Sequence, residues 1–248
     1  MNNSLKGKSA IVTGASRGIG KAIALKLGQL GASVAVNYAN NGNLAKEVVS
    51  EITSMGAQAI PVQADLRDVK KIEYLFNETI KAFGALDILV NNAGVMINTR
   101  IEEVSEEEFD NVFALNIKGV FFACHYAAKK MSDGGRIVNI STSVTKLMFP
   151  AYGTYAASKG AVEQLTKVAA KELGPRRITV NAISPGPTDT ELFRKGKTEE
   201  QINNFKNMTA LGRLGTPADI ANAVAFIVSE EAGWISGQNI CANGGFVA

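Results

Sequence analysis

Short runs of apolar and β-branched residues alternate with longer segments of helical period from residue 8 to beyond residue 180. This alternation constrains the fold, because strands separated by helices pair in parallel within one sheet. Runs with few polar positions are typical of strands that helices cover on both faces. The pattern predicts a doubly wound α/β fold of about seven strands. The candidate strands are residues 9–13, 33–38, 59–64, 87–92, 136–140, 178–184 and 238–242.

The segments between these strands carry start signals for helices. Ser105 followed by Glu108 fits a capping box, in which each side chain accepts a hydrogen bond from the backbone of the other residue. No Gly/Ser-rich or Pro-rich linker divides the chain, so residues 1–248 are expected to form one domain. Helices are expected to begin near Gly18, Asn43, Asp68, Ser105 and Ala151.

The stretch from Pro185 to about Leu214 interrupts the alternation and contains no clear strand. A connection of this length is typical of a functional segment. Ligands of parallel sheets bind at the carboxyl ends of strands, which is where this stretch begins. Residues 187–214 are therefore expected to act as a substrate lid.

Composition excludes several classes of function. Hydrophobic residues make up 46% of the chain and charged residues 20%, which allows a large core without disulfides or a metal. The formal charge of +3 is spread along the chain, so nucleic acid is not an expected partner. No apolar run approaches the ~20 residues that cross a bilayer, so no membrane partner is expected. Because the first residues also lack a signal-peptide pattern, a cytoplasmic location is expected.

Cys124 and Cys241 are the only cysteines, and His125 is the only histidine. Their spacing fits neither a metal site nor a disulfide framework. The cysteines are expected to be buried small hydrophobes. No metal-binding residues are predicted. With His125 as the only histidine, a histidine-based catalytic triad is not expected either.

The first predicted strand runs directly into TGASRGIG, so Gly14, Gly18 and Gly20 lie where strand becomes helix. Glycines at such a turn let the main chain approach a pyrophosphate, and the helix N-terminus offers N–H groups and a partial positive charge. The spacing Gly-x-x-x-Gly-x-Gly differs from the G-x-G-x-x-G fingerprint. The context predicts a dinucleotide site, and a tight turn without a ligand is the alternative.

The second predicted strand ends in VNYANNG, which contains no acidic residue. Enzymes that use NAD usually carry Asp or Glu there, which binds the ribose 2′-hydroxyl and repels a 2′-phosphate. Here Arg17 offers a cation to that phosphate, and the neutral side chains of Tyr38, Asn40 and Asn41 offer donors. We expect NADP(H) as the cofactor in preference to NAD. The alternative is that Arg17 is a solvated charge beside ordinary turn residues.

Tyr155 and Lys159 are four residues apart, a spacing that puts both side chains on one face of a helix. Reduction of a ketone leaves an alkoxide that needs a proton, and a phenol with a pKa near 10 exchanges protons poorly at neutral pH. A neighbouring ammonium group stabilises the phenolate. Tyr155 is expected to act as the acid/base, with its pKa tuned by Lys159. A well-positioned acid/base group typically contributes about a hundred- to ten-thousand-fold in rate.

Five motifs together resemble the short-chain dehydrogenase/reductase family, and they span essentially the whole chain. The family resemblance implies a Rossmann-type fold. The VNYAN run is also similar to that of NADP-dependent fungal naphthol reductases within the family. The motifs are TGASRGIG at 13–20, NNAG at 91–94, Asn116, YAASK at 155–159 and PGPTDT at 185–190.

The resemblance also implies site residues. A hydroxyl after the fifth strand should hold the substrate oxygen. Thr142 lies thirteen residues before Tyr155, the commonest family spacing, whereas alignment of the following Ser-Val selects Ser143, which we prefer. Asn116 matches the asparagine that binds a water linked to the lysine. Cofactor contacts are implied for Gly14, Ser16, Arg17, Gly18, Ile19, Gly20, Tyr38, Asn40, Asn41, Asp65, Leu66, Asn91, Ala93, Gly94, Tyr155, Lys159, Pro185, Gly186 and Thr188.

These features predict an NADP(H)-dependent oxidoreductase that transfers a hydride between the nicotinamide and a small-molecule ketone or secondary alcohol. The alternatives are a 3-oxoacyl-carrier-type reductase with a basic docking patch, and a non-catalytic dinucleotide-binding sensor. The family commonly forms tetramers, so a homotetramer is expected. The expected pocket lining is apolar and comprises Leu147, Met148, Phe149, Tyr152, Leu192 and Phe193. The candidate basic patch comprises Arg100, Lys129, Lys130, Arg194, Lys195 and Lys197.

Overall fold

The computed structural model describes residues 4–247, and its centre is a seven-stranded parallel sheet. The strand order is β3-β2-β1-β4-β5-β6-β7, which confirms the predicted doubly wound fold. The predicted strand ranges agree with the observed ones to within one residue. The strands are β1 (Ser9–Val12), β2 (Ser33–Tyr38), β3 (Ala59–Gln63), β4 (Ile88–Asn91), β5 (Arg136–Ile140), β6 (Thr179–Pro185) and β7 (Asn239–Ala242).

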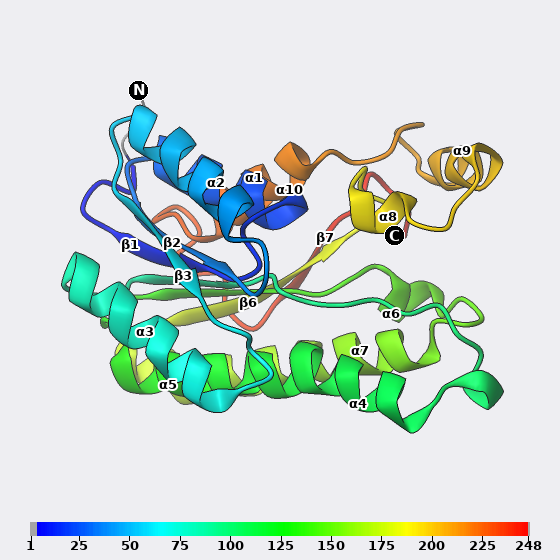
Figure 1. Ribbon diagram of the computed structural model, residues 1–248, viewed down its shortest axis with the longest axis horizontal. Helices are drawn as coiled ribbons and strands as arrows, with labels where there is room; N and C mark the ends of the chain where they lie inside the picture. The colour runs from blue at the N-terminus through cyan, green and yellow to red at the C-terminus, as the bar shows by residue number, and fades with distance from the viewer. Residues whose placement is uncertain (1–3, 248) are drawn as a thin grey trace.

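Helices cover both faces of the sheet, with α1, α2 and α10 on one side and α3, α4, α5 and α7 on the other (Figure 1). The α-helices are α1 (Gly18–Gln29), α2 (Gly42–Ser54), α3 (Val69–Phe83), α4 (Glu106–Phe113), α5 (Val120–Lys130), α6 (Val144–Leu147), α7 (Gly153–Leu173), α8 (Glu191–Arg194), α9 (Glu199–Met208) and α10 (Pro217–Ile227). A π-helical turn (Ala114–Gly119) joins α4 to α5, and short 3₁₀ turns span Ile101–Glu103 and Gly174–Arg176.

The predicted helix starts lie within about two residues of the observed ones, and the capping box of Ser105 and Glu108 is present. Helix α10 was not among the predicted helices. Its signal was available, because Thr216 and Asp219 form a further capping box around Pro217 at the first helical position.

Strands β1, β2, β4, β5 and β6 supply both cores, because successive side chains point to opposite faces. Val12 packs in one core with Ile23 and Leu27 of α1. Ile11, its neighbour in β1, packs in the other core with Phe76 of α3. Because side chains on both faces of a strand are buried, both are apolar, and the strands appear in the sequence as continuous apolar runs.

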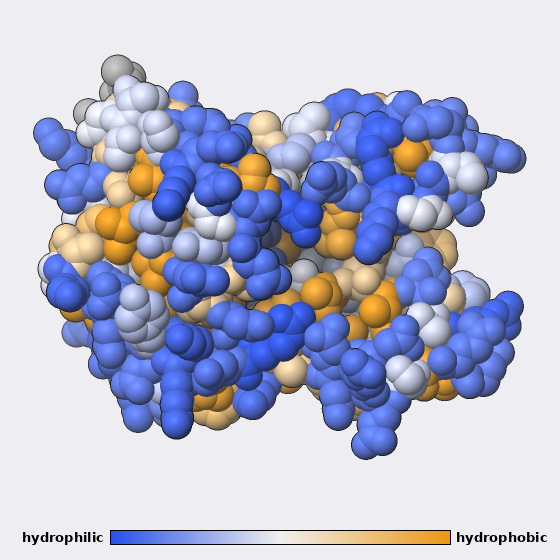
Figure 2. All heavy atoms as spheres, viewed as in Figure 1, coloured by the Kyte–Doolittle hydropathy of each residue, from blue (hydrophilic) through white to orange (hydrophobic). Residues whose placement is uncertain are grey.

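The strand order reverses direction at β1, which lies between β2 and β4. Helices that leave neighbouring strands toward opposite faces open a crevice at the carboxyl ends of those strands. At the same edge, the segment after β6 forms α8 and α9, which stand apart from the sheet (Figure 1). Figure 2 shows a hollow between the lobe of α8 and α9 and the lobe opposite it, with hydrophobic residues gathered along it.

The two cysteines differ in their surroundings. Cys124 is buried as expected, and burial raises the pKa of its thiol to about 12. Cys241 is only partly buried and borders a pocket near the end of β7, so the expectation of a buried residue was wrong for it. A strand so close to the sheet edge has fewer neighbours to cover it. Among residues 4–247, no helix is both long enough and apolar enough to cross a membrane.

Two helical glycines provide a matched test of packing. A Cβ added at Gly160 in α7 would meet no atom within 4 Å, whereas one at Gly28 in α1 would lie 2.7 Å from Cγ2 of Ile52. We expect Gly160→Ala to raise the free energy of unfolding by about 0.5–1 kcal/mol through helix propensity. Gly28→Ala should lower it by about 1–3 kcal/mol through overpacking. Urea unfolding checks both, and equal effects would contradict the packing described here.

Candidate active site

The glycine-rich turn between β1 and α1 fits an anion. Gly14 and Gly18 adopt φ of 61° and 57°, in the left-handed region. A Cβ on Gly20 would lie 2.3 Å from the carbonyl oxygen of Gly14, so only glycine permits this approach. Within the described chain, no side chain caps the N-terminus of α1, which leaves its first N–H groups for a ligand. The turn therefore suits a dinucleotide pyrophosphate.

Two asparagines that sequence reasoning left outside the site hold this turn. Asn37, at the end of β2, is buried, and its Oδ1 accepts a hydrogen bond from the Gly14 N–H at 3.2 Å. Asn92, after β4, donates from Nδ2 to the carbonyl oxygens of Thr13 (2.9 Å) and Gly14 (3.2 Å). The Oγ1 of Thr13 in turn accepts from the N–H groups of Asn92 and Ala93. The sequence signal that could have predicted this role is the presence of polar residues at the ends of apolar strands that neighbour a glycine-rich turn.

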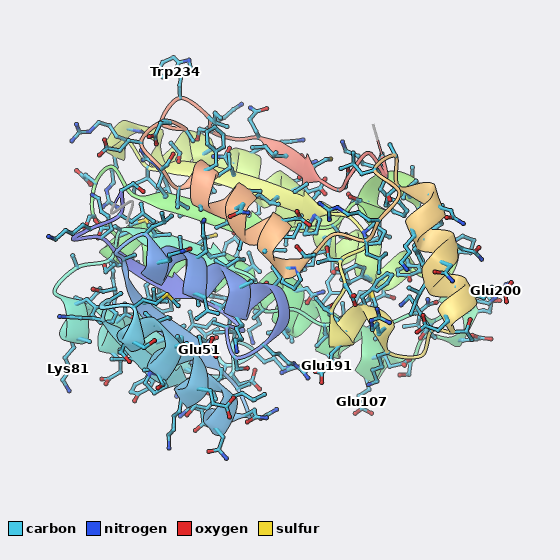
Figure 3. All side chains as sticks on the ribbon, turned by 90° about the horizontal axis from the view of Figure 1, so that it is seen from above. Glu51, Lys81, Glu107, Glu191, Glu200 and Trp234 are labelled. Atoms are coloured by element: carbon cyan, nitrogen blue, oxygen red, sulfur yellow. The ribbon has the colours of Figure 1, made fainter. Side chains whose placement is uncertain are left out.

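The expected 2′-phosphate ligands lie at one edge of the turn. Arg17 donates to Glu191 of α8 at 2.9 Å, and Figure 3 shows Glu191 at the surface of the molecule. Because these side chains are 71% and 79% exposed, the pair contributes at most about 1 kcal/mol and a phosphate can replace Glu191. Tyr38 is partly buried and Asn40 is exposed beside it.

Asn41 has a structural role that the sequence prediction did not include. Its Oδ1 accepts a hydrogen bond from the Leu44 N–H at 3.3 Å and caps α2. Only its amide NH₂ is left to donate to a phosphate. The hydroxyl of Tyr38 lies 3.3 Å from the position that a Cβ on Gly42 would occupy, so this glycine admits the tyrosine ring.

The cofactor contacts expected after β3 and β4 are partly structural. The carboxylate of Asp65 accepts from the Arg67 backbone N–H at 3.0 Å and pairs with its guanidinium at 3.1 Å. Asp65 and Arg67 also line a pocket of about 490 Å³, which leaves space beside them. The side chains of Leu66 and Asn91 point into the core instead, where Asn91 donates to Asn139 at 2.9 Å. Leu66 and Asn91 can therefore offer a cofactor only their main chain.

Tyr155 and Lys159 lie on one face of α7, as their spacing predicted. Lys159 is 4% exposed, and its Nζ donates to the carbonyl oxygen of Ile140 at the end of β5, 2.7 Å away. A Cβ on Gly94 would lie 3.4 Å from that Nζ and 3.1 Å from Oδ1 of Asn116. Three distant stretches of sequence therefore meet at the lysine.

Asn116 lies in the π-helical turn and is fully buried. Its Oδ1 accepts from the Val95 N–H, and its Nδ2 donates to the Val95 carbonyl oxygen, both at 2.9 Å. Nδ2 also donates to Oγ of Ser158 at 3.0 Å. The side chain is thus engaged by protein groups and ties α7 to the segment after β4, a role that the resemblance did not imply. π-Turns within α-helices frequently mark functional sites.

The electrostatics of the pair differ from the expectation. Burial raises the pKa of Tyr155 to about 12, although the hydrogen bond with Thr142 acts in the opposite direction. Burial also lowers the pKa of Lys159 to about 8. The expected lowering of the Tyr155 pKa by Lys159 is therefore not observed, because desolvation dominates for both groups. Tyr155 carries its proton throughout the neutral range.

The two candidate hydroxyls after β5 point in different directions. The side chain of Thr142 lies close enough to the Tyr155 phenol to oppose the rise in its pKa, while the hydroxyl of Ser143 donates to the Ser184 carbonyl oxygen at 3.4 Å. The preference for Ser143 thus finds no support in the geometry. The geometry favours Thr142, which the count of thirteen residues selects, and its assignment as the catalytic hydroxyl stays a prediction.

The segment after β6 closes the site from the other side. A Cβ on Gly186 would lie 2.8 Å from the main chain of Asn243, so glycine allows the end of β6 to pass beside β7. Thr188 donates to the Gly186 carbonyl oxygen at 2.9 Å. A Cβ on Gly18 would lie 3.8 Å from Thr190, which places this segment beside the glycine-rich turn. Pro185 and Gly186 therefore lie at the same sheet edge as Gly14.

Aromatic side chains from three segments gather above this edge. Phe149, before α7, lies with its ring centroid 6.3 Å from that of Phe205 and 6.2 Å from that of Phe246. Phe193 of α8 lies 5.4 Å from Phe205 of α9. Tyr152 lies 6.2 Å from Phe149. Phe205 and Phe246 were missing from the predicted lining, because only the fold brings α9 and the last residues to Phe149.

The comparisons with known proteins agree with this geometry. A family model described as enoyl-(acyl carrier protein) reductase matches residues 14–247. AacuN of Aspergillus aculeatus, a short chain dehydrogenase/reductase, is 43% identical over 253 residues, with 97% of this chain and 96% of AacuN covered. The chain belongs to the short-chain dehydrogenase/reductase family.

Two solved structures of short-chain dehydrogenase/reductases share the fold. The landomycin C-6 ketoreductase LanV, solved with bound NADP and rabelomycin, is 44% identical with a TM-score of 0.90, and 98% of each chain is covered. A short chain dehydrogenase from Burkholderia cenocepacia J2315, solved in complex with NADP, is 37% identical with a TM-score of 0.95. That likeness covers 99% of this chain and all of the Burkholderia chain.

The buried Lys159 makes stability depend on pH. Between pH 8 and 10.5 the folded protein has released the Lys159 proton while the unfolded chain still binds it, so stability rises with pH in that window. Lys159→Met removes this contribution. We expect the wild type to gain on the variant by up to about 1.4 kcal/mol per pH unit above pH 8, measured by urea unfolding at several pH values. Parallel pH profiles would contradict the lowered pKa.

Proposed function

We propose that this chain is an NADP(H)-dependent oxidoreductase that reduces a ketone to a secondary alcohol, or runs the reverse reaction. The observation that carries the proposal is the meeting of Tyr155, Lys159 and Thr142 beside the glycine-rich turn. A proton donor, a buried cation and a second hydroxyl then share one sheet edge with a turn whose uncapped helix N-terminus suits a pyrophosphate. Family membership supports the same reaction class.

Three features support NADP over NAD. The end of β2 carries no acidic residue to repel a 2′-phosphate. Arg17 stands beside the turn with only an exposed partner, Glu191. Two similar structures, LanV and the Burkholderia enzyme, contain NADP. The residues that would hold the cofactor are those of the turn, Tyr38, Asn40, the free amide of Asn41, Asp65, the main chain at 91–94 and the segment from Pro185 to Thr188.

In this proposal Tyr155 is the general acid of reduction. The chemistry that bound NADPH supplies is a hydride for the carbonyl carbon. Tyr155 donates its proton to the carbonyl oxygen, and the hydroxyl of Thr142 donates a hydrogen bond to the same oxygen as charge develops on it. The Lys159 ammonium stabilises the phenolate that results. Asn116 fixes the segment against which Lys159 packs, and its expected water relay stays a prediction.

The aromatic cluster supports a hydrophobic, ring-containing ketone as the substrate. Phe149, Phe193, Phe205 and Phe246 offer ring faces and edges to a planar molecule. LanV, at 44% identity, was solved with rabelomycin in place. The phenol of Tyr152, whose ring lies 6.2 Å from that of Phe149, adds a polar group to this cluster.

An acyl-carrier substrate is the second candidate, and the ion pairs count against it. It needs a basic docking patch, yet Arg194 is paired with Asp189 and Glu199. Lys130 is likewise paired with Glu73. A sensor without catalysis has no chemical use for Tyr155 and Lys159, so the enzyme is the better proposal.

Residues 187–214 are proposed to act as the lid of a single-domain protein, because α8 and α9 lie over the hollow and carry Phe193 and Phe205. A homotetramer is proposed as well. Large apolar side chains are exposed on α5 and α7, at Phe121 and Val168, and at the fully exposed Trp234, which projects from the molecule in Figure 3. The cytoplasmic location stays a prediction.

Arg17 and Glu191 provide a matched pair of variants for the cofactor. Arg17→Ala should weaken NADPH binding about tenfold and leave NADH binding unchanged, because it removes a charge-assisted hydrogen bond to the 2′-phosphate. Glu191→Gln should leave NADPH binding equal or tighter, because it removes a competitor for Arg17. Titration followed by nicotinamide fluorescence measures both. Equal affinity of the wild type for NADPH and NADH would sink the assignment of Arg17.

Turnover of NADPH with a panel of aromatic ketones tests the reaction. Tyr155→Phe should lower kcat at least about a hundredfold, because the proton donor is lost. Thr142→Val should lower kcat by about a hundredfold, whereas Ser143→Ala should stay within a few-fold of the wild type. A larger loss in Ser143→Ala than in Thr142→Val would reverse the assignment of the hydroxyl. Tight NADPH binding without turnover on any ketone would favour the sensor.

A further inference from the structure

Glu163 of α7 has contacts that the proposed reaction does not use directly. It follows Lys159 by one helical turn and Tyr155 by two, so it lies on the same side of the helix. Its Oε1 accepts hydrogen bonds from the hydroxyls of Ser141 and Thr145, each at 2.7 Å. One carboxylate oxygen on the catalytic helix therefore binds the loop after β5 at two points.

These two donors stand on either side of Thr142. The main chain there is fixed as well, because the Ser141 N–H donates to the Ile183 carbonyl oxygen at 2.7 Å. The Ser143 N–H donates to the Pro185 carbonyl oxygen at 3.0 Å. The hydrogen bonds to β6 thus fix the loop against the sheet, while those to Glu163 fix it against α7.

The carboxylate also fixes the direction of the hydroxyl protons. An ionised carboxylate only accepts, so the proton of Ser141 is directed to it. The single proton of Thr145 has two acceptors, Oε1 of Glu163 at 2.7 Å and the Thr142 carbonyl oxygen at 2.9 Å, of which the charged carboxylate is the stronger. The Val144 N–H donates to Oγ1 of Thr142 at 3.3 Å, which engages a lone pair of that hydroxyl. The Thr142 proton is then left for Tyr155 or for a substrate oxygen, as a hydrogen-bond donor in the reaction requires.

We propose that Glu163 is a positioning residue, whose carboxylate holds Ser141 and Thr145 so that the Thr142 hydroxyl faces Tyr155. This inference rests on the proposed function, in which Thr142 binds the carbonyl oxygen. Glu163 itself touches neither Tyr155 nor Lys159 in the hydrogen bonds of the described residues, so it acts through the loop.

Steady-state kinetics of Glu163→Ala and Glu163→Gln test the proposal, with Glu172→Ala as the control. Glu172 is an exposed glutamate near the end of the same helix. Glu163→Ala should lower kcat about 10- to 100-fold with the KM for NADPH unchanged, because a small displacement of a reacting group has effects of that size. Glu163→Gln keeps an acceptor oxygen and should recover kcat to within about threefold of the wild type. Glu172→Ala should match the wild type.

A double variant separates positioning from general support of the fold. If Glu163 acts through Thr142, Thr142→Val should cost little further kcat in the Glu163→Ala background. Losses that multiply, or a folded Glu163→Ala with kcat within twofold of the wild type, would overturn the proposal.

Failure of the proposed function has a different signature. In that case the wild type reduces no ketone, and crystal structures of the wild type and Glu163→Ala decide the question. A Thr142 hydroxyl that leaves Tyr155 only in the variant would support positioning by Glu163. An unchanged loop over residues 141–145 would overturn it.

Discussion

The hydrogen bonds that join the carboxyl ends of β1, β2 and β4 are the constraint on which the rest of the structure depends. Asn37 reaches Gly14 from β2, and Asn92 reaches the same turn from the end of β4. Because these partly buried contacts are satisfied, the turn keeps backbone angles that only glycine adopts easily. The uncapped N-terminus of α1, which offers its N–H groups to a ligand, depends on that turn.

Helix α7 carries an unfavourably buried charge at the same edge. Burial of the Lys159 ammonium lowers its pKa to about 8, which corresponds to roughly 3 kcal/mol of unfavourable desolvation at neutral pH. One hydrogen bond, to Ile140, offsets part of it. The two hydrophobic cores, one on each face of the sheet, supply stability that offsets the burial of this group. An apolar residue at this position would pack better and would leave Tyr155 without a neighbouring cation.

Sequence patterns predicted the parts of the site that depend on local geometry. The four-residue spacing of Tyr155 and Lys159 fixes their common face, because a helix turns every 3.6 residues. The glycine spacing at 14–20 likewise predicted the turn, since a backbone so close to its neighbours leaves no room for Cβ. The parallel strands were readable because both of their faces are buried, which leaves a continuous apolar run.

The directions in which side chains point could not be predicted from the sequence in the same way. Thr142 and Ser143 are neighbours of the same chemistry, and only the fold turns one toward Tyr155 and the other toward Ser184. Asn91 resembled a cofactor residue, yet its side chain points to Asn139. In each case the deciding contact joins residues far apart in the sequence, so no local pattern contains it.

The sequence by itself determined the fold class, the positions of the strands along the chain and the residue types that meet at the sheet edge. Burial of strands and the helical period each leave a recognisable pattern of apolar residues, which is why these features could be predicted. The tertiary structure alone decided which hydroxyl lies beside Tyr155, that burial raises the pKa of Tyr155 and lowers that of Lys159, and that Phe149, Phe205 and Phe246 form one surface. Those outcomes depend on distances and desolvation between segments that only folding brings together.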